Sequence, residues 1–290
     1  RQHSLCDFST SESWVILSPI EQSIKRKIEA VGTPLKDWDI NIYRGVLTGC
    51  NEAFIITTEK RNEILANCQT EEERERTGNI IRPIIRGRDI KRYGYEWADL
   101  WLIATFPSRH YDIEEYPAVK TYLLSFGIER LEQTGKKYVI NGEEVKARKK
   151  TNNKWFETQD SINYWQDFLK PKIIWKRVGS ILRFGYNDNG ALGLDSTCFA
   201  TGKQIEYLCC VLNSPMGHYL LKDSPKTGTG DLLISVQAVE PIKVPLINEE
   251  ENSKFKNLFK THQENEINRE VYELYNLSEE EIKFIMDNYY

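Results

Sequence analysis

The sequence predicts a mixed α+β fold, with a β-rich body, peripheral helices and a helical tail at the C-terminus. Short apolar and β-branched runs, separated by glycine-containing turns, recur through most of the chain and are typical of strands. Apolar residues at helical spacing are concentrated near the two ends. Of the 290 residues, 40% are apolar and 11% are aromatic, so the chain can bury a large core and is not disordered.

The first part of the chain alternates helical and strand-like patterns. Ser18 and Glu21 have the spacing of a capping box around Pro19, and the isoleucines that follow predict a helix that ends near Gly32. A turn-rich loop with two glycines, 44–51, separates the next two strand-like runs. The elements expected in this part are strands at 40–43 and 53–58, a polar helix at 64–76, a buried strand at 101–106 and an amphipathic helix at 117–133.

The second part begins with the polar segment 137–153, in which Asn141-Gly142 predicts a hairpin turn or a mobile loop. Pro241 and Pro245 bracket an extended stretch, and three amphipathic helices are expected after it. We therefore expect a body over 1–247 and a helical tail over 248–290. The other expected elements are strands at 173–175, 180–184 and 198–200, a short helix at 203–212 and a Gly-rich loop at 224–231.

The composition also bears on location. No apolar run approaches the roughly 20 residues that span a bilayer, so no membrane partner is expected. The six cysteines lack paired metal-ligand spacing, and only Cys209 and Cys210 are close neighbours, which predicts reduced thiols and a cytoplasmic protein. Residue 1 is Arg, so we expect the chain to be a piece of a longer polypeptide.

The net charge of −4 hides an uneven distribution. From Glu249 to the end there are 11 acidic and 5 basic side chains, whereas two earlier segments are strongly basic. One runs from Arg82 to Arg92, and the other, from Lys146 to Arg183, is interleaved with aromatic residues. Such clusters create local positive potential and favour an anionic polymer as partner, although a solvated surface is the alternative reading. Trp155 and Trp175 are expected in the core rather than as stacking platforms.

Catalytic motifs are scarce. No two prolines are adjacent, which excludes the Pro-Pro-aromatic motif of amino-methyltransferases, and no G-x-G-x-x-G occurs. Glu144-Val145-Lys146 supplies the E-x-K half of a metal-dependent nuclease site, so a DNA endonuclease that uses Glu144 and Lys146 is one alternative. A protein-docking module, with the acidic tail against a partner, is another. We expect no catalytic residue and no metal ligand in this chain.

Several segments in order resemble the TaqI-like C-terminal specificity domains, the target-recognition domains of adenine-N6 DNA methyltransferases and type IIG restriction-modification enzymes. The opening segment is Ile42-Tyr43-Arg44-Gly45-Val46-Leu47-Thr48-Gly49-Cys50-Asn51-Glu52-Ala53-Phe54-Ile55-Ile56, and the second signature is Arg82-Pro83-Ile84-Ile85-Arg86-Gly87-Arg88-Asp89-Ile90-Lys91-Arg92-Tyr93. The further similar segments are 155–157 with 171–174, 212–214 with the Gly-rich loop and 239–245 after it, and the tail helix 271–282.

The resemblance implies that residues 1–247 form a DNA target-recognition domain that binds double-stranded DNA and adjoins the catalytic methyltransferase domain of the same parent chain. That parent is expected to be an adenine-specific DNA methyltransferase, with or without endonuclease activity. No cofactor is expected in this chain, whereas S-adenosylmethionine, with or without magnesium, is expected for the missing domains.

Residue chemistry and the resemblance together give a set of candidate DNA contacts. Phosphates are bound by Lys, Arg, hydroxyls and loop amides, and bases are read by Arg, Asn or Gln. Arg44 and Arg88 have the alternative role of bracing their own loops, and the recognition sequence stays open. The candidates are Arg44, Thr48, Asn51, Arg86, Arg88, Lys91, Arg92, Arg148, Lys149, Lys150, Lys154, Lys176, Arg177, Arg183, Lys226 and Thr227.

Overall fold

The computed structural model describes residues 16–290, so Cys6, one of the expected thiols, lies outside the described residues. The chain forms two compact units. Unit 1 comprises 16–42, 178–184 and 202–290, and unit 2 comprises 43–177 and 185–201. Within the described part, no helix has the length and apolar character needed to cross a membrane. The expected division after residue 247 stays a prediction.

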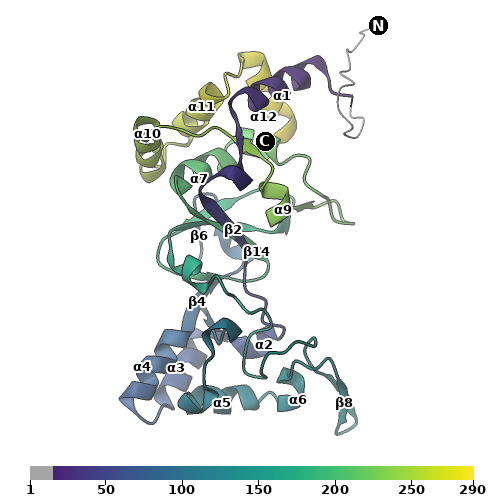
Figure 1. Ribbon diagram of the computed structural model, residues 1–290, viewed down its shortest axis with the longest axis vertical. Helices are drawn as coiled ribbons and strands as arrows, with labels where there is room; N and C mark the ends of the chain where they lie inside the picture. Colours follow the sequence, from purple (N-terminus) through teal and green to yellow (C-terminus); the bar gives the residue numbers. More distant parts are fainter. Residues whose placement is uncertain (1–15) are drawn as a thin grey trace. The chain divides into compact units, whose positions relative to one another are not determined.

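Unit 1 is mainly helical. It contains α1 (Pro19–Val31), α7 (Ile205–Asn213), α8 (Pro215–Leu220), α9 (Val236–Val239), α10 (Glu249–Lys260), α11 (Glu264–Leu274) and α12 (Glu279–Tyr289), with the 3-10 helix η1 (Leu35–Asp37). Two short antiparallel pairs join β1 (Thr33–Pro34) to β16 (Lys243–Val244) and β11 (Val178–Gly179) to β15 (Leu232–Leu233). Figure 1 shows α12 in yellow next to α1.

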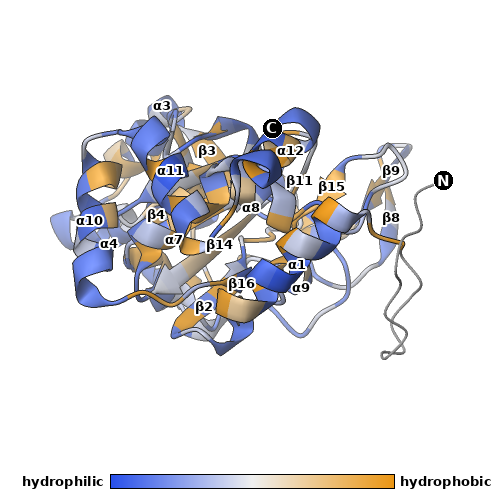
Figure 2. Ribbon diagram, turned by 90° about the horizontal axis from the view of Figure 1, so that it is seen from above, coloured by the Kyte–Doolittle hydropathy of each residue, from blue (hydrophilic) through white to orange (hydrophobic). Residues whose placement is uncertain are grey.

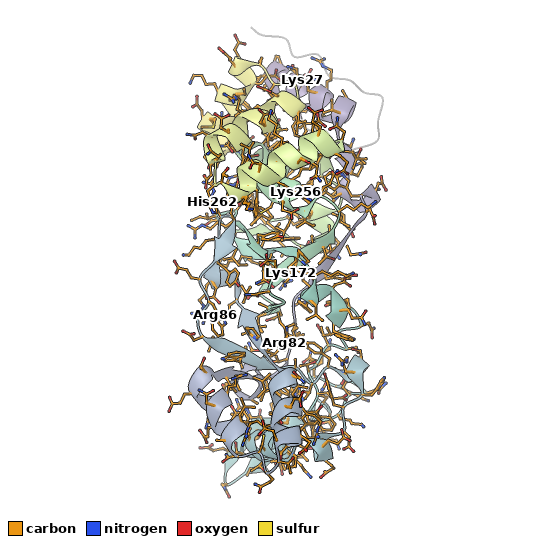
Figure 3. The ribbon with its side chains drawn as sticks, turned by 90° about the vertical axis from the view of Figure 1, so that its left-hand side faces the viewer. Lys27, Arg82, Arg86, Lys172, Lys256 and His262 are labelled. Atoms are coloured by element: carbon orange, nitrogen blue, oxygen red, sulfur yellow. The ribbon has the colours of Figure 1, made fainter. Side chains whose placement is uncertain are left out.

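The core of unit 1 forms around α7, whose side chains are almost all buried. The Tyr207 ring lies 4.8 Å from that of Phe255 on α10, and its hydroxyl donates to the Pro245 carbonyl at 2.8 Å. An ion pair joins Lys27 of α1 to Glu281 of α12 (Figure 3). The outward sides of α10 and α11 are largely hydrophilic (Figure 2), as the amphipathic spacing predicts.

Unit 2 holds a four-stranded sheet of order β13-β4-β7-β3. Its central strands pair antiparallel, with Ile81 opposite Ile103, and β13 adds in parallel. Ile84, Leu102 and Phe54 are fully buried in the core that this sheet shares with the helices. The elements are β3 (Ile55–Thr57), β4 (Ile81–Ile85), β7 (Leu100–Ile103), β13 (Leu192–Gly193), α2 (Asn51–Phe54), α3 (Thr58–Ala66), α4 (Glu71–Ile80), α5 (Pro117–Leu124) and α6 (Ile128–Leu131).

A second sheet has the order β12-β10-β14-β2. Its centre is the antiparallel pair of β10 (Lys172–Lys176) and β14 (Thr197–Gly202), with Ile174 opposite Phe199. The outer strands are β12 (Phe184–Asn187) and β2 (Ile40–Arg44), in both of which the chain passes from one unit to the other. Two hairpins and four 3-10 helices complete unit 2: β5 (Ile90–Lys91) with β6 (Gly94–Tyr95), β8 (Lys137–Ile140) with β9 (Glu143–Lys146), and η2 (Gly87–Asp89), η3 (Pro107–Arg109), η4 (Ile113–Glu115) and η5 (Trp165–Leu169).

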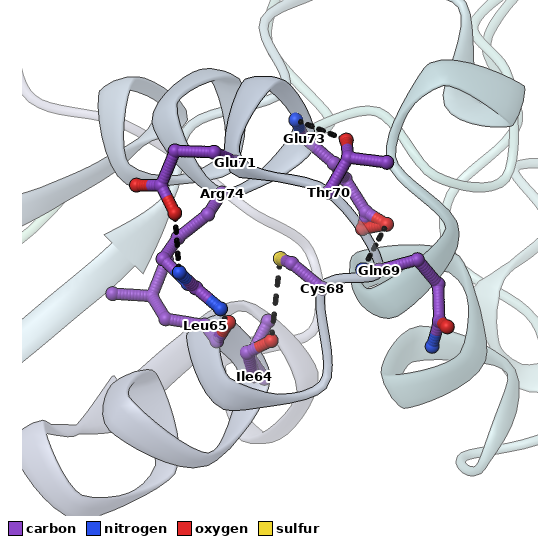
Figure 4. A network of polar contacts seen from close by, with 8 residues as sticks. All are labelled: Ile64, Leu65, Cys68, Gln69, Thr70, Glu71, Glu73 and Arg74. Atoms are coloured by element: carbon purple, nitrogen blue, oxygen red, sulfur yellow. Dashed lines mark hydrogen bonds and ion pairs between the residues drawn. The ribbon is translucent and has the colours of Figure 1, made fainter.

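The mixed α+β class and the helical C-terminal segment are confirmed, but several elements differ. The strand expected at 53–58 is shortened to β3, because Asn51–Phe54 form α2 and the Thr57 hydroxyl accepts from the Lys60 N–H to start α3. The helix expected at 64–76 is two helices, because the Thr70 hydroxyl accepts from the Glu73 N–H and starts a new helix (Figure 4). The helix expected at 117–133 is interrupted at Gly127, where φ is +87°. The strand expected at 180–184 instead begins at Phe184, whose N–H and C=O are both bound by the Asn213 side chain.

Candidate nucleic-acid interface

A group of cations gathers around one turn of unit 2, the Asp195–Ser196 turn. The Gly87 N–H donates to Ser196 Oγ at 3.0 Å, and the Arg177 N–H donates to the Ser196 carbonyl at 2.9 Å. A Cβ on Gly87 would lie 2.9 Å from Lys176 Cγ, so only glycine allows this approach. The turn therefore brings the end of β10 beside η2. We call Arg44, Arg86, Arg88, Lys176 and Arg177 the turn cluster.

The members of the turn cluster differ in whether their charged groups can contact a phosphate group. Arg86 forms a two-point ion pair with Asp89, at 3.0 and 2.8 Å, and this hydrogen bonding raises the pKa of Arg86. Its guanidinium therefore braces η2 (Figure 3). Arg88 and Lys176 are exposed, and Arg177 is half-buried. Exposed cations are the ones that can reach a phosphate without rearrangement. Farther along the chain, Lys91 is exposed and Arg92 is half-buried.

The loop 45–51 is held tightly against the rest of unit 2. Thr48 is buried, and its hydroxyl donates to Asn51 Oδ1 at 2.6 Å and accepts from the Cys50 N–H at 3.1 Å. Gly49 has φ +78°, and a Cβ there would lie 2.9 Å from Arg148 Cδ. Thr48 thus orders the loop from inside and leaves Asn51 exposed at its end.

Arg148 lies in the interior, with a residue exposure of 4%. Its Nε donates to the Leu131 carbonyl at 2.8 Å, and its two terminal nitrogens donate to the carbonyls of Thr48 at 2.6 Å and Trp155 at 2.7 Å. Burial lowers the pKa of Arg148 to about 10, so the side chain is still charged at neutral pH. This candidate DNA contact therefore holds three segments of unit 2 together.

Beside Arg148 lies an open cavity of about 550 Å³. Asn51, Arg130, Lys146 and Arg148 are among its lining residues, with Glu52 as the one carboxylate among them. Arg130 and Glu52 form an ion pair at 2.5 Å. Arg130 gives no signal in the sequence, because it is a single cation next to Glu129 in the short helix α6. Lys149, Lys150 and Lys154 are all exposed in the segment that follows Arg148.

The Asp160 carboxyl is affected by charged side chains from several segments of unit 2. Burial raises the pKa of the Asp160 carboxyl, the charges of Arg44 and Lys149 lower it, and Asp195 raises it. Arg44 also lies 3.8 Å from the Asp195 carboxylate, and its carbonyl accepts from the Tyr164 hydroxyl at 2.8 Å. Arg44 and Lys149 therefore act on the same carboxyl.

The remaining candidates lie in unit 1. Lys226 is exposed and begins a tight turn, in which the Thr227 N–H donates to the Asp231 carbonyl at 2.8 Å and the Thr227 and Thr229 hydroxyls are 2.9 Å apart. Arg183 is half-buried just before β12. The turn is thus stabilised by its own hydroxyl groups.

Glu144, the carboxylate of the nuclease alternative, lies on exposed strand β9 and pairs with Lys137 at 3.1 Å. Over residues 16–290, no group of three or more His, Cys, Asp or Glu side chains is arranged to hold a metal ion. The placement of Glu144 therefore gives the nuclease alternative no support.

One buried lysine lies apart from these groups. Lys172 Nζ donates to the Phe168 carbonyl and to Asn187 Oδ1, both at 2.8 Å (Figure 3). Burial and the charge of Arg82 lower the pKa of Lys172 to about 7. Its full burial makes it a structural group rather than a phosphate contact.

The sequence and the fold are both similar to those of known proteins. A sequence model of the TaqI-like C-terminal specificity domain matches residues 82–236, slightly more than half of the chain. The match includes the second signature, the segments 155–157 and 171–174, and the Gly-rich loop, so the resemblance is confirmed. No curated protein matches the sequence.

Among solved structures, the chain is similar to the type IIL restriction-modification enzyme MmeI in complex with DNA, with a TM-score of 0.56 and 11% identity over 89% of this chain and 36% of that chain. It also matches the type IIG restriction endonuclease BpuSI, with a TM-score of 0.48 and 10% identity over 83% and 27% of the two chains. The likeness to MmeI is one of fold, and the chain spans about a third of the length of MmeI. On the match over residues 82–236, the chain belongs to the family of TaqI-like C-terminal specificity domains.

Proposed function

We propose that the chain is the sequence-specific double-stranded DNA recognition module of a type II restriction-modification enzyme. The observation that carries the proposal is the turn cluster of unit 2, where Ser196 binds the N–H groups of Gly87 and Arg177 and so brings the exposed Arg88 and Lys176 close together. Family membership supports it, because these are specificity domains. A surface with clustered cations and ordered loops is suited to a duplex, whose backbone carries dense negative charge.

Different residues serve the two parts of recognition. Arg88, Lys149, Lys150, Lys176 and Arg177 contact phosphates and fix the register of the duplex without specifying its sequence. Asn51 presents an amide at the end of an ordered loop, the chemistry that reads adenine in the major groove. Arg86, Thr48 and Arg148 position these groups instead of touching DNA.

The proposal places catalysis elsewhere. The parent enzyme is an adenine-specific methyltransferase, with or without cleavage activity, and its catalytic domain is the protein partner of this chain. S-adenosylmethionine, and magnesium if the parent cleaves, belong to that domain. The residues of this chain hold the duplex while the partner flips the target adenine out of the stack. An enzyme that acts on DNA in this way works in the cytoplasm.

Salt-dependent DNA binding tests the proposal. The affinity of the chain for a randomised duplex of about 30 base pairs is measured by fluorescence anisotropy at about 50 and 200 mM salt, and a fall of about 100-fold or more is expected from several phosphate contacts. In the triple variant Lys149→Glu, Lys150→Glu, Arg177→Glu, binding weakens and the salt dependence becomes shallower, by about 0.9 in the logarithmic slope for each lost contact.

The matched control reverses two exposed lysines of α10, Lys256→Glu and Lys260→Glu, and should leave the salt dependence unchanged. Figure 3 labels Lys256. An unchanged slope in the triple variant, or an equal loss in the control, would contradict the proposed surface.

A further inference from the structure

The β8–β9 hairpin extends away from α6 in unit 2 (Figure 1) and belongs to no larger sheet. Its turn residues Asn141 and Gly142 have φ values of +51° and +84°, as a tight two-residue hairpin turn requires. One face is anchored to the unit: the Tyr138 hydroxyl donates to Glu132 at 2.8 Å, and Val145, opposite Tyr138, is half-buried. The other face carries Lys137, Val139, Glu144 and Lys146, all of which are exposed.

The end of this exposed face that lies away from the turn is cationic. Lys137 and Lys146 lie directly opposite each other across the two strands. Like charges in this position destabilise a hairpin, and Glu144 relieves Lys137 alone through its ion pair at 3.1 Å. An anion bound between the two lysines would remove the repulsion. Lys146 also lines the cavity that contains Asn51, so this face continues the proposed DNA surface.

The tip of the hairpin has the opposite character. Val139 is 77% exposed and Ile140 is 36% exposed, and Glu143, opposite Ile140, is exposed as well. A carboxylate is repelled by phosphates but accepts hydrogen bonds from the amino groups of bases. An exposed valine gains nothing from a phosphate. The hairpin therefore matches a duplex when its cationic end contacts the phosphate backbone and its tip contacts the edges of the base pairs.

The dimensions of the hairpin select the groove. Paired strands lie about 4.8 Å apart before their side chains are counted, so a minor groove of about 6 Å must widen to accept the ribbon. The major groove, about 12 Å wide, admits a two-stranded ribbon. The thymine methyl is the apolar group of the major groove in unmodified DNA, so it is the complement of an exposed valine.

We propose that the β8–β9 hairpin enters the major groove, with Lys137 and Lys146 on backbone phosphates and Val139 against a thymine methyl group. This inference rests on the proposed DNA-recognition function. It makes the hairpin a base-reading element for an A·T pair in the target site.

The test removes the methyl group from the DNA and the apolar side chain from the protein. Duplexes bound by the 290-residue chain are selected from a randomised pool, and the selected site is then made with thymine or with uracil. Replacing thymine by uracil should weaken wild-type binding about fourfold for each contacted methyl, the equivalent of about 0.8 kcal/mol. Val139→Ser should bind the thymine duplex as weakly as the wild type binds the uracil duplex, and should not respond to the replacement.

The control is Leu246→Ser, which changes another exposed apolar residue, 60% exposed and in unit 1, and should retain the full response to uracil. Equal wild-type binding of the two duplexes, or a full uracil response in Val139→Ser, would overturn the inference. In that case, the proposed function would still be supported if the chain binds duplex DNA and if the triple variant of Lys149, Lys150 and Arg177 reduces the salt dependence of that binding. Absence of duplex binding would reject both.

Discussion

Arg148 and Lys149 are neighbours in the sequence with opposite expected roles, and this contrast gives the sharpest test of the structure. Arg148 is buried and donates to the carbonyls of Leu131, Thr48 and Trp155. Lys149 is exposed and contributes to the potential at Asp160. The perturbation is Arg148→Met, which retains most of the aliphatic length but removes the charge and every donor. Lys149→Met is the matched control.

The size of the effect follows from two opposing contributions. A hydrogen bond to a charged group contributes about 1.5–3 kcal/mol, so losing three costs roughly 4.5–9 kcal/mol. Removing the buried charge recovers part of this: burial lowers the pKa of Arg148 from 12.5 to about 10, which corresponds to about 3 kcal/mol of desolvation cost. The lost hydrogen bonds outweigh the recovered desolvation. We expect Arg148→Met to lower the free energy of unfolding by about 3 kcal/mol, to order of magnitude.

Two assays separate the roles. Urea unfolding measures the free energy of unfolding, and anisotropy measures the salt slope of duplex binding. Lys149→Met should change stability by less than about 0.5 kcal/mol and reduce the salt slope by about one. If Arg148→Met were as stable as the wild type and yet lost duplex affinity, Arg148 would be a DNA contact and not a structural residue.

Two further predictions concern stability. For Lys172, the folded pKa of about 7 lies below the value of about 10.4 in an unfolded chain, so between these pH values the unfolded state binds more protons. As the pH rises through this range, the free energy of unfolding of the wild type should increase by up to about 1.4 kcal/mol per pH unit relative to that of Lys172→Met. Urea unfolding of both proteins at about pH 7 and pH 9 measures this, and a difference independent of pH would contradict the burial of a titrating amine. For Gly45, a Cβ would lie 1.9 Å from the Leu194 carbonyl oxygen, so Gly45→Ala should destabilise by about 1–3 kcal/mol. The control is Gly78→Ala in α4, where no atom lies within 4 Å of the new Cβ, and it should stabilise the protein by about 0.5–1 kcal/mol. Equal shifts of the two melting curves would contradict the close approach of Gly45 to the Leu194 carbonyl.

Much of the secondary structure was predictable because the sequence features that start helices and turns act over only a few residues. The capping boxes at Ser18 and Ser278 act within three residues and start α1 and α12 as expected. The Asn141-Gly142 turn is equally local and forms the expected hairpin. The helix breaks near Thr70 and Gly127 were less clear, since a polar helical pattern continues across Thr70 and an amphipathic pattern continues across Gly127.

The family was also within reach of the sequence, because short ordered signatures depend only on residue identity and spacing. The match over 82–236 contains the signature that begins at Arg82. A uniform helical or strand pattern would have carried no such information.

The sequence by itself determined where positive charge is concentrated, how the main elements begin, and which family the chain belongs to. Only the tertiary structure decided which cations are available. Arg148 and Lys149 look alike in a basic run, yet the first is enclosed by carbonyls from three segments and the second is exposed. Arg86 is likewise committed to Asp89, whereas Arg88 is exposed. The physical reason is that burial and hydrogen-bond partners depend on residues brought together from distant parts of the chain, and no local pattern records them.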